Sequence, residues 1–515
     1  MAVSVVGILA QNRVFLEHSD VLAFDEQRLP DAQILRGDVR FRHEDALMYC
    51  DSAYFYEKTN SVTAFGRIRF VQGDTLFGYG NRLYYDGNTR LARLCRNVRL
   101  EHRTTVLTTD SLNYDRNTNL AYYFTGGTIR DSLNMLQSVW GEYCPTNSQA
   151  VFHNQVHLEN DRFTFDTDTL HYNTESHIAQ IVCPTTIVYE QETTITSENG
   201  LYNTQTEQSV LYDQSLIAHN DGKQLTGDTI FYDKKSGYGE LRRHIEIRDT
   251  IQKVSLLGHY GQMWEQDKRG MATDSAMLVL WSDNEPTYMH ADSLFTEEVP
   301  FTDTLGKDTT FRQFRAFHHV RAYSKDYQLV CDSLSFNSHD SIMVLHRLPI
   351  CWSDSNQISA DSITLYFHND KLHHIYGVGS AMGTRQVSDL YFDQIAGKEM
   401  TAWVINDEVK RVDVSGNAET VFYPKEDDGS LIGVNTTQSS DIQVFIENQQ
   451  IHHILFTTTT SGVLYPLHEL TLDKQRLSGF FWAAGERPVS KDDIFLTPPR
   501  TERPKRSAVS ASSGQ

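Results

Sequence analysis

The stretch Leu107–Arg130, LTTDSLNYDRNTNLAYYFTGGTIR, contains the unit from which most of this chain is built. It opens with Asp110–Asp115, continues through a polar turn at Arg116–Asn119, and then places a short apolar run on each side of Gly126 and Gly127. A spacing of about 29 residues, or twice that, separates most of the similar openings, and such a period is typical of repeat architectures. These openings lie at residues 51–56, 81–86, 168–172, 199–202, 228–233, 332–336 and 361–365.

Each unit predicts short β-strands. Leu112 and Tyr114 are two residues apart, so in an extended chain they share a face while Asn113 points to the other face. The same alternation of apolar and polar residues occurs in the runs of the other units. Clusters of Asn, Asp, Thr and Gly between the runs favour turns. No long stretch has helical spacing, so the sequence predicts an all-β protein.

The alternation also predicts which side chains face the interior. His157 lies between two apolar residues and is therefore expected to face solvent, whereas its two neighbours face inward. The inward residues that we select in this way are Ile68, Phe70, Val98, Leu100, Leu112, Tyr114, Ile129, Val156, Leu158, Leu170, Tyr172, Ile245 and Ile247. The pattern alone assigns them to a core.

The chain of 515 residues is acidic, with a formal net charge of −21. This charge argues against a nucleic-acid partner, because phosphates require a basic surface. It also disfavours adsorption to an anionic membrane. The six cysteines are widely spaced: their even number is compatible with disulfides in an oxidising compartment, but we interpret most of them as small buried hydrophobic residues.

Three histidine pairs, at residues 318–319, 373–374 and 452–453, suggest metal binding at first sight. Adjacent residues of a strand face opposite sides, and no acidic residue completes a known ligand spacing, so structural or surface roles are favoured. The recurring Asp51, Asp110, Asp168 and Asp228 stand at strand starts beside Ser or Thr and are interpreted as turn and corner formers. We therefore predict no enzyme, no metal site and no cofactor.

The organisation of the chain follows the regularity of the repeats. Residues 1–10 resemble the tail of a secretory signal peptide, and an ordinary first strand or a frayed end is the alternative. The predicted regions are 11–250 as a first repeat region, 251–480 as a second and less regular one, 481–496 as a C-terminal cap, and 497–515 as a disordered, Pro/Ser-rich tail.

The repeat resembles the organic solvent tolerance (OstA-like) family, which includes the periplasmic bridge proteins of lipopolysaccharide transport. The resemblance rests on Asp110–Asp115, the turn after it, the alanine-bearing run Asn119–Ala121, and Gly127–Arg130. It is strong over about residues 30–250 and weaker over about 310–460. The length and the segment 487–495 look like the long OstA-like proteins of the Bacteroidetes lineage.

This resemblance implies an elongated antiparallel β-jellyroll, open at its ends, that is not an enzyme and needs no cofactor. It implies an apolar groove for the acyl chains of lipid A, lined by the inward residues named above. It further implies a periplasmic or cell-envelope location, lipopolysaccharide as ligand, and docking of other transport components through terminal strand edges. End-to-end self-association would use the same edges.

Two rival interpretations remain open at the level of sequence. A structural β-repeat scaffold or adhesin-like protein would have the same pattern with a filled core and no lipid site. A carbohydrate-active β-helix would need a shorter rung and one rung with clustered catalytic residues, and no rung is distinguished in that way.

Overall fold

The computed structural model describes residues 13–282, 285–302, 306, 308–369, 371–406, 408–426, 428–447 and 450–504. Contacts group the chain into two compact units, Met1–Lys235 (unit 1) and Ser236–Gln515 (unit 2), and each is described by itself. Residues 1–10, which resemble a signal peptide, lie outside the described residues. The limits 11–250 and 251–480 stay predictions, since they rest on the regularity of the repeats rather than on contacts.

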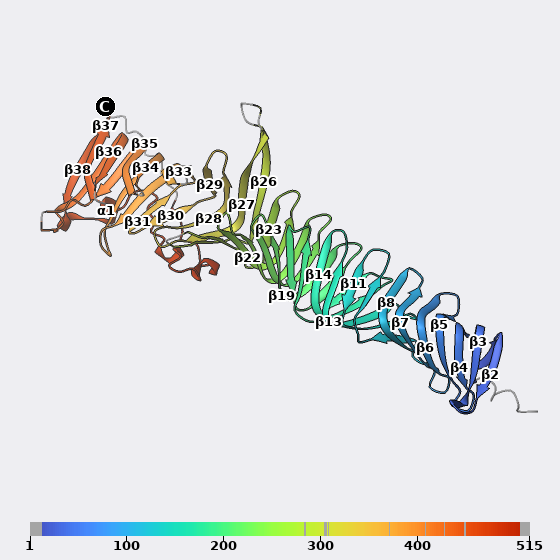
Figure 1. Ribbon diagram of the computed structural model, residues 1–515. Coiled ribbons are helices and arrows are strands. Elements are labelled where there is room, and N and C mark those ends of the chain that lie inside the picture. Colours follow the sequence, from blue (N-terminus) through green and yellow to red (C-terminus); the bar gives the residue numbers. More distant parts are fainter. Residues whose placement is uncertain are drawn as a thin grey trace, which may run out of the picture. The chain divides into compact units, whose positions relative to one another are not determined.

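Unit 1 is built from strands that pair in antiparallel fashion and follow one another as rungs (Figure 1). Polar turns of the predicted kind join them. The strands are β1 Phe15–His18, β2 Val21–Asp25, β3 Leu29–His43, β4 Ala46–Tyr56, β5 Ser61–Gln72, β6 Leu76–Asp86, β7 Leu91–His102, β8 Thr105–Asp115, β9 Leu120–Tyr123, β10 Gly127–Arg130, β11 Met135–Ser138, β12 Trp140–Cys144, β13 Gln149–Glu159, β14 Phe163–Asn173, β15 Ile178–Ile181, β16 Thr185–Tyr189, β17 Thr193–Ser197, β18 Gly200–Asn203, β19 Gln208–His219 and β20 Lys223–Asp233.

The long strands of unit 1 bend at a corner where the pairing is interrupted by a β-bulge. In β4, the register with β5 shifts between Tyr49 and Ser52. Opposite this point, Gly66 and Arg67 of β5 have positive φ angles of 73° and 36°. A Cβ added to Gly66 would lie 2.5 Å from a carboxylate oxygen of Asp51, so this corner favours glycine. The two halves of each bent strand therefore belong to two different walls.

Aspartates occupy these corners, as the sequence analysis predicts. Asp51 accepts a hydrogen bond of 2.9 Å from Nε of Arg67 across the bulge. Asp228 accepts one from the side chain of Gln214, which also has a positive φ angle. The interpretation of Asp51 and Asp228 as corner formers is confirmed.

One wall of unit 1 carries a buried aromatic side chain at each repeat, and we call it the tyrosine wall. Small residues alternate with these aromatic ones from strand to strand: Tyr114 of β8 pairs with Ala92 of β7 and Ala121 of β9. The rings from Tyr114 to Tyr202 each lie between two small residues in this way, which lets neighbouring strands pack closely. The buried aromatic residues are Phe55, Tyr85, Tyr114, Tyr143, Tyr172, Tyr202 and Tyr232.

Unit 2 continues the antiparallel rung pattern and ends in short helical turns. Its elements are β21 Tyr238–Asp249, β22 Val254–Trp264, β23 Arg269–Thr273, β24 Met277–Leu280, β25 Thr287–His290, β26 Ser293–Thr302, β27 Asp308–Tyr323, β28 Gln328–Asn337, β29 Ile342–His346, β30 Ile350–Ser353, β31 Asn356–Ser359, β32 Ser362–His368, β33 Lys371–Gln386, β34 Phe392–Ile405, β35 Glu408–Phe422, β36 Gly433–Glu447, β37 Gln450–Thr457, β38 Ser461–Pro466, η1 Leu467–Glu469, α1 Leu472–Gln475, η2 Ala484–Glu486 and η3 Asp493–Phe495.

A C-terminal strap, residues 467–504, covers the outer face of one wall of unit 2. Phe481 and Ala483 of the strap pack with Val330, Ile350 and Trp352 in one buried cluster. These three strand residues alternate with inward-facing ones, so the wall is buried on both faces. This explains why the apolar–polar alternation weakens here, since a strand covered on both sides is apolar throughout. The strap includes the predicted cap, 481–496, and residues 497–504 of the predicted tail.

The prediction of an all-β, antiparallel jellyroll made of repeats is confirmed. In unit 1, β1 and β2 pair only with β3 among the described residues, so each leaves one edge free. In unit 2, β37 and β38 pair only with β36 within the described part of the chain. Free edges of this kind are the places where a jellyroll can accept another strand.

Candidate functional site

The predicted inward residues of unit 1 lie between its two walls. Leu112, Tyr114, Leu170 and Tyr172 belong to the tyrosine wall, and each is at most 2% exposed. The opposite wall contributes six aliphatic residues and one phenylalanine, also at most 2% exposed: Ile68, Phe70, Val98, Leu100, Ile129, Val156 and Leu158. The two walls thus form one continuous apolar interior from side chains that are far apart in sequence.

Two of these residues meet directly across the interior. The rings of Phe70 and Tyr114 lie edge to face, with centroids 5.9 Å apart. Such an arrangement is favourable beyond the area that the rings bury. His157, between two buried residues of β13, instead turns outward and donates hydrogen bonds to the carboxylates of Asp166 and Glu159. The bond to Asp166 raises the pKa of His157.

The two predicted residues of unit 2 lie at its first strand. Ile245 is buried, and Ile247 is half-buried. Their partners across the β21–β22 ladder are Gly258 and Leu256, respectively. They therefore occupy the same place on their wall as the corresponding residues of unit 1, directly after a corner.

The interior of unit 1 is closed along one side by hydrogen bonds between the two walls, a row that we call the seam. Tyr85 of the tyrosine wall bonds Nδ1 of His43 on the opposite wall at 2.5 Å. In later rungs, Tyr114 donates to Gln72 at 3.1 Å, and Tyr143 bonds His102 at 2.9 Å. The seam therefore joins the tips of the walls rung after rung.

Burial in the seam shifts the titration of its members. Burial, followed by the charge of Arg116, lowers the pKa of His43, and burial also lowers the pKa of His102. Burial raises the pKa of Tyr85 and of Tyr114. The neutral forms of these four side chains are thus favoured, because a charge on them would lose its hydration.

A buried arginine anchors the seam near β4. The side chain of Arg116 is 3% exposed and donates to the Tyr85 hydroxyl at 2.9 Å and to a carboxylate oxygen of Asp45 at 2.5 Å. The charge is therefore compensated, as burial requires. Further along, Asn134 donates to the hydroxyls of Tyr172 and Thr204, both at 2.9 Å.

The seam is not among the features predicted from the sequence, although the sequence carries a signal for it. Polar residues of the opposite wall recur at the same spacing as the tyrosines of the tyrosine wall, and those at 43, 72, 102 and 131 hydrogen-bond to tyrosines. They stand at the ends of apolar runs, where a polar residue is easily taken for the start of a turn. The recurring positions are 43, 72, 102, 131, 160, 189 and 219.

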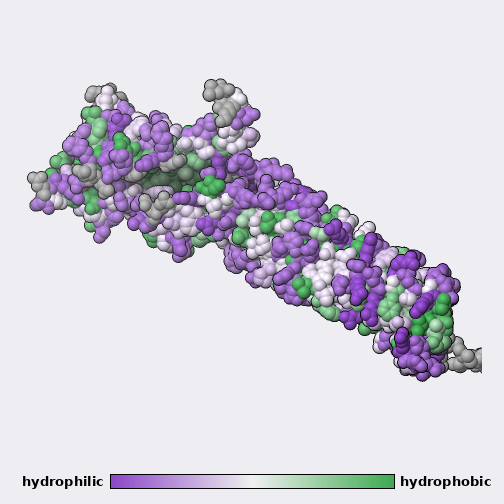
Figure 2. Space-filling model, viewed as in Figure 1, coloured by the Kyte–Doolittle hydropathy of each residue, from purple (hydrophilic) through white to green (hydrophobic). Residues whose placement is uncertain are grey.

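Unit 2 presents its inward side chains differently. A row of cross-strand neighbours, the apolar row, runs over the wall that the strap leaves uncovered. The facing wall carries small inward residues such as Ala381, Gly383 and Ala418. Figure 2 shows hydrophobic surface within a hollow of unit 2. The half-buried members of the apolar row are Phe336, Met343, Leu365, Ile375, Val412 and Ile454.

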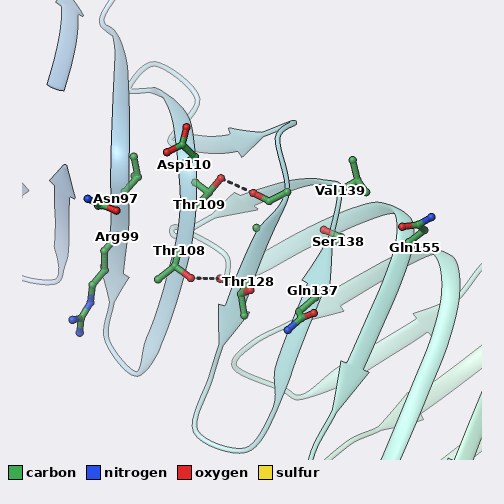
Figure 3. A pocket seen from close by; sticks show the side chains of 13 residues that line it. Asn97, Arg99, Thr108, Thr109, Asp110, Thr128, Gln137, Ser138, Val139 and Gln155 are labelled. Carbon is green, nitrogen blue, oxygen red and sulfur yellow. Dashed lines mark hydrogen bonds between the residues drawn. The ribbon is translucent and has the colours of Figure 1, made fainter. Parts of the chain in front are cut away.

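A recess of about 780 Å³ lies on the outside of unit 1 at the corners of β7, β8 and neighbouring strands (Figure 3). Two of its hydroxyls already have partners, since Thr109 donates to the carbonyl of Gly126 at 2.6 Å and Thr108 to that of Thr128 at 3.4 Å. Arg99 at its rim pairs with Glu101. The recess is therefore polar, and part of its lining is already hydrogen-bonded.

The histidine pairs contact carboxylates or rings rather than forming a metal cluster. His319 lies 3.0 Å from Asp292, and His318 lies 3.5 Å from Asp332. Among the described residues, no three His, Cys, Asp or Glu side chains gather as metal ligands. All six cysteines are free, and burial raises the pKa of Cys50 to about 12. No helix in the described part of the chain is long and apolar enough to cross a membrane.

Among the comparisons with known proteins, the family match lies within unit 1. Residues 11–168 and 164–228 match the model of the OstA-like protein family. This part of the chain is OstA-like. None of the curated proteins matches the sequence. A solved structure with 15% identity is LptH from Pseudomonas aeruginosa, described as the LptA homologous periplasmic component of the conserved lipopolysaccharide transport device; the match covers 27% of this chain and 95% of that chain, with a TM-score of 0.22.

Proposed function

We propose that this OstA-like protein binds the acyl chains of lipopolysaccharide between its walls and takes part in lipopolysaccharide transport across the periplasm to the outer membrane. The apolar row of unit 2 carries the proposal. Its members are half-buried and follow one another across neighbouring strands at about 4.8 Å per strand. A continuous apolar strip of this kind suits acyl chains, which gain about 0.8 kcal/mol per buried CH₂.

The interior of unit 1 supports the same function in a second way. Its inward residues are already packed together, so acyl chains would enter only where the seam parts. The charged headgroup would stay in water outside the walls, because burying an unpaired phosphate is costly. Unit 2 is therefore the part of the protein that accepts chains first.

Free strand edges favour partners that add a strand. β1 and β2 at one terminus expose Phe15 (47%) and Phe24 (67%), and β37 and β38 leave edges free at the other. We propose that other transport components, or further copies of this chain, pair with these edges. A periplasmic or envelope location follows from this function.

Photo-crosslinking in growing cells tests the lipid site. A crosslinking residue at Leu365, on the apolar row, should capture glycolipid, whereas one at the neighbouring Thr364, on the outer face, should not. Leu158 and His157 form the matched pair in unit 1, where weaker capture is expected because the interior is filled. Equal capture at Leu365 and Thr364, or none at either in a folded protein, would overturn the proposal.

A structural scaffold without a lipid site is the second candidate. The observation that favours it is the packing of unit 1, where the inward residues are at most 2% exposed. Absence of glycolipid at all inward positions of both units, with the fold intact, would support this scaffold.

A further inference from the structure

An open recess of about 670 Å³ lies on the outer face of the tyrosine wall, between β5 and β8. Its lining includes the carboxylate of Asp86, which already accepts the backbone N–H groups of Asn88 and Thr89 at 2.9 Å and 3.4 Å. It also includes Arg82, Arg93 and Arg96 together with Tyr84 and Asn113, and we call it the arginine recess. All five side chains carry hydrogen-bond donors. The recess is therefore suited to a ligand that is rich in acceptors and negatively charged.

The strand register brings these residues together. Leu83 is buried in the interior, so Arg82 and Tyr84 on either side of it point to the outer face. Tyr84 pairs with Arg93 across the β6–β7 ladder. Arg96 stands at the corner of β7 with a φ angle of 66°. Three guanidinium groups thus come from two adjacent strands and one corner.

These three arginines differ from most others in unit 1. Within the described residues, none of the three has a carboxylate within ion-pair distance, in a chain whose net charge is −21. A local excess of positive charge on an acidic protein attracts anions specifically to that place. By contrast, a carboxylate lies within 4.0 Å of Arg40, Arg42, Arg67, Arg90, Arg99, Arg103, Arg116 and Arg162.

Arg82 is held in place but lacks an acceptor. Its guanidinium lies over the rings of Phe65 and Tyr84, 5.4 Å and 4.5 Å from their centroids. Such stacking fixes the plane of the group. The Nε atom of Arg82 is buried, and no acceptor for it exists among the described residues. A buried donor without an acceptor is unfavourable, and an anionic ligand would supply what is missing.

We propose that the arginine recess binds a phosphoryl group, to which Arg82, Arg93 and Arg96 donate hydrogen bonds. Guanidinium groups bind phosphate oxygens in pairs, and three positive charges match a dianion better than a single carboxylate. The source is either the phosphorylated headgroup of a glycolipid or a free phosphate ester. A glycolipid headgroup as the source rests on the proposed function. This source agrees with the position of the recess outside the walls, where a headgroup would remain hydrated.

The test compares two triple variants of the full chain. R82Q/R93Q/R96Q removes the recess arginines, and R69Q/R99Q/R103Q removes three charges from the outer face and turn of the opposite wall. Arg69 is a close control, because it also lies over two rings, those of Tyr49 and Phe77, at 5.6 Å and 5.9 Å. Both variants change outward residues, so circular dichroism and thermal unfolding should match those of the wild type.

Titration calorimetry with inorganic phosphate at low salt provides the first measurement. The recess variant should bind phosphate about tenfold or more weakly than the control variant, and added salt should weaken the wild-type affinity. Equal phosphate binding by the two variants, or no binding by the wild type, would overturn the site.

Binding of dispersed lipopolysaccharide, either intact or enzymatically dephosphorylated, distinguishes the two sources of the phosphoryl group. Weaker binding of intact lipopolysaccharide by the recess variant, lost after dephosphorylation, would support the headgroup. Phosphate binding that depends on the recess, with equal lipopolysaccharide binding by all variants, would support the site and exclude the headgroup. A third outcome is that no crosslinks form at Leu365 while phosphate binding still depends on the recess. It would reject the proposed binding of acyl chains and support the phosphoryl site.

Discussion

Unit 1 and unit 2 use the same alternation of inward and outward residues but cover their faces differently. In unit 1 the interior is closed by a seam of tyrosines with His43, Gln72 and His102. In unit 2 the strap covers the outer face of one wall, while the apolar row on the other stays half-buried. The comparison shows that periodicity decides where side chains point, whereas distant segments decide what covers them.

Two glutamine side chains attach the strap by hydrogen bonds to its peptide groups. Gln357 accepts from the amide of Ala483 at 2.9 Å and donates to the carbonyl of Phe481 at 3.1 Å. Gln394 makes the same pair of bonds with Leu477 and Gln475, both at 2.8 Å. One wall of unit 2 is thus held by the strap on its outer face. The hollow on its inner face therefore does not depend on hydrogen bonds like those of the seam.

The largest expected effect comes from a charge placed inside unit 1. Leu158→Asp would bury an unpaired carboxylate in a filled interior, where Leu158 is 0% exposed, and should cost several kcal/mol. Leu365→Asp introduces the same group on the half-buried apolar row, where water can reach it, and should cost about 1 kcal/mol. Chemical denaturation followed by circular dichroism measures both losses.

Equal losses for the two aspartate variants would break the comparison, since they would mean that the interior of unit 2 is as closed as that of unit 1. Leu158→Asn and Leu365→Asn serve as controls with similar shape and no charge. Each should cost less than its aspartate counterpart, and the difference should be larger at residue 158.

Loss of one of these glutamines should destabilise unit 2 alone. Gln357→Leu leaves the buried indole N–H of Trp352 and two strap peptide groups without partners, at about 1–3 kcal/mol per unsatisfied group. Amide hydrogen exchange should become faster at Ala483 and unchanged in unit 1. The half-buried Gln443 offers the control, and Gln443→Leu should change stability by about 0.5 kcal/mol or less.

The sequence predicted the walls well, because a period of two is a local property of extended chains. Val156, Leu158 and the outward His157 between them lie as expected. The corner role of Asp51 was also predictable, since the residue recurs with turn-forming neighbours, but its predicted place at a strand start was wrong, because Asp51 lies inside β4 at the bulge. These features depend on residues close together in the chain.

The seam and the strap could not be predicted in the same way. His43 and Tyr85 are 42 residues apart, and their contact depends on how the two walls meet at their tips. Gln357 and Ala483 are 126 residues apart, and nothing near either residue indicates the other. The arginine recess was missed because Arg82 and Arg93 look like ordinary outward residues until their missing carboxylates are noticed.

A hydroxyl deletion tests whether the seam stabilises unit 1. Tyr85→Phe removes the group that bonds His43 and Arg116 and should cost about 1–2 kcal/mol. Tyr202 occupies the equivalent place, but its buried hydroxyl has no partner among the described residues, so Tyr202→Phe should be neutral or slightly stabilising. Thermal unfolding of the two variants distinguishes a stabilising seam from simple ring packing, for which both substitutions would behave alike.

The smallest expected effect is a dependence of unit 1 on pH. Burial lowers the pKa of His43 and of His102, so the folded protein favours their neutral forms, whereas the unfolded chain titrates near the ordinary value of about 6.5. Below that pH the unfolded chain binds protons first. The stability is therefore complete above about 6.5 and is lost as the pH falls from there through the folded pKa values.

Denaturant unfolding at pH 7 and pH 5.5, with hydrogen exchange read from unit 1 peptides, measures this loss. His43→Gln with His102→Gln should make it smaller, because glutamine cannot take up the proton. His157→Gln should have the opposite sign: the bond to Asp166 raises the pKa of His157, so its stabilising contribution is present at low pH and lost as the pH rises through that value. If the loss of stability between pH 7 and pH 5.5 is unchanged in the double variant, protonation of His43 and His102 does not cause it. Acid would then weaken unit 1 through its carboxylates instead.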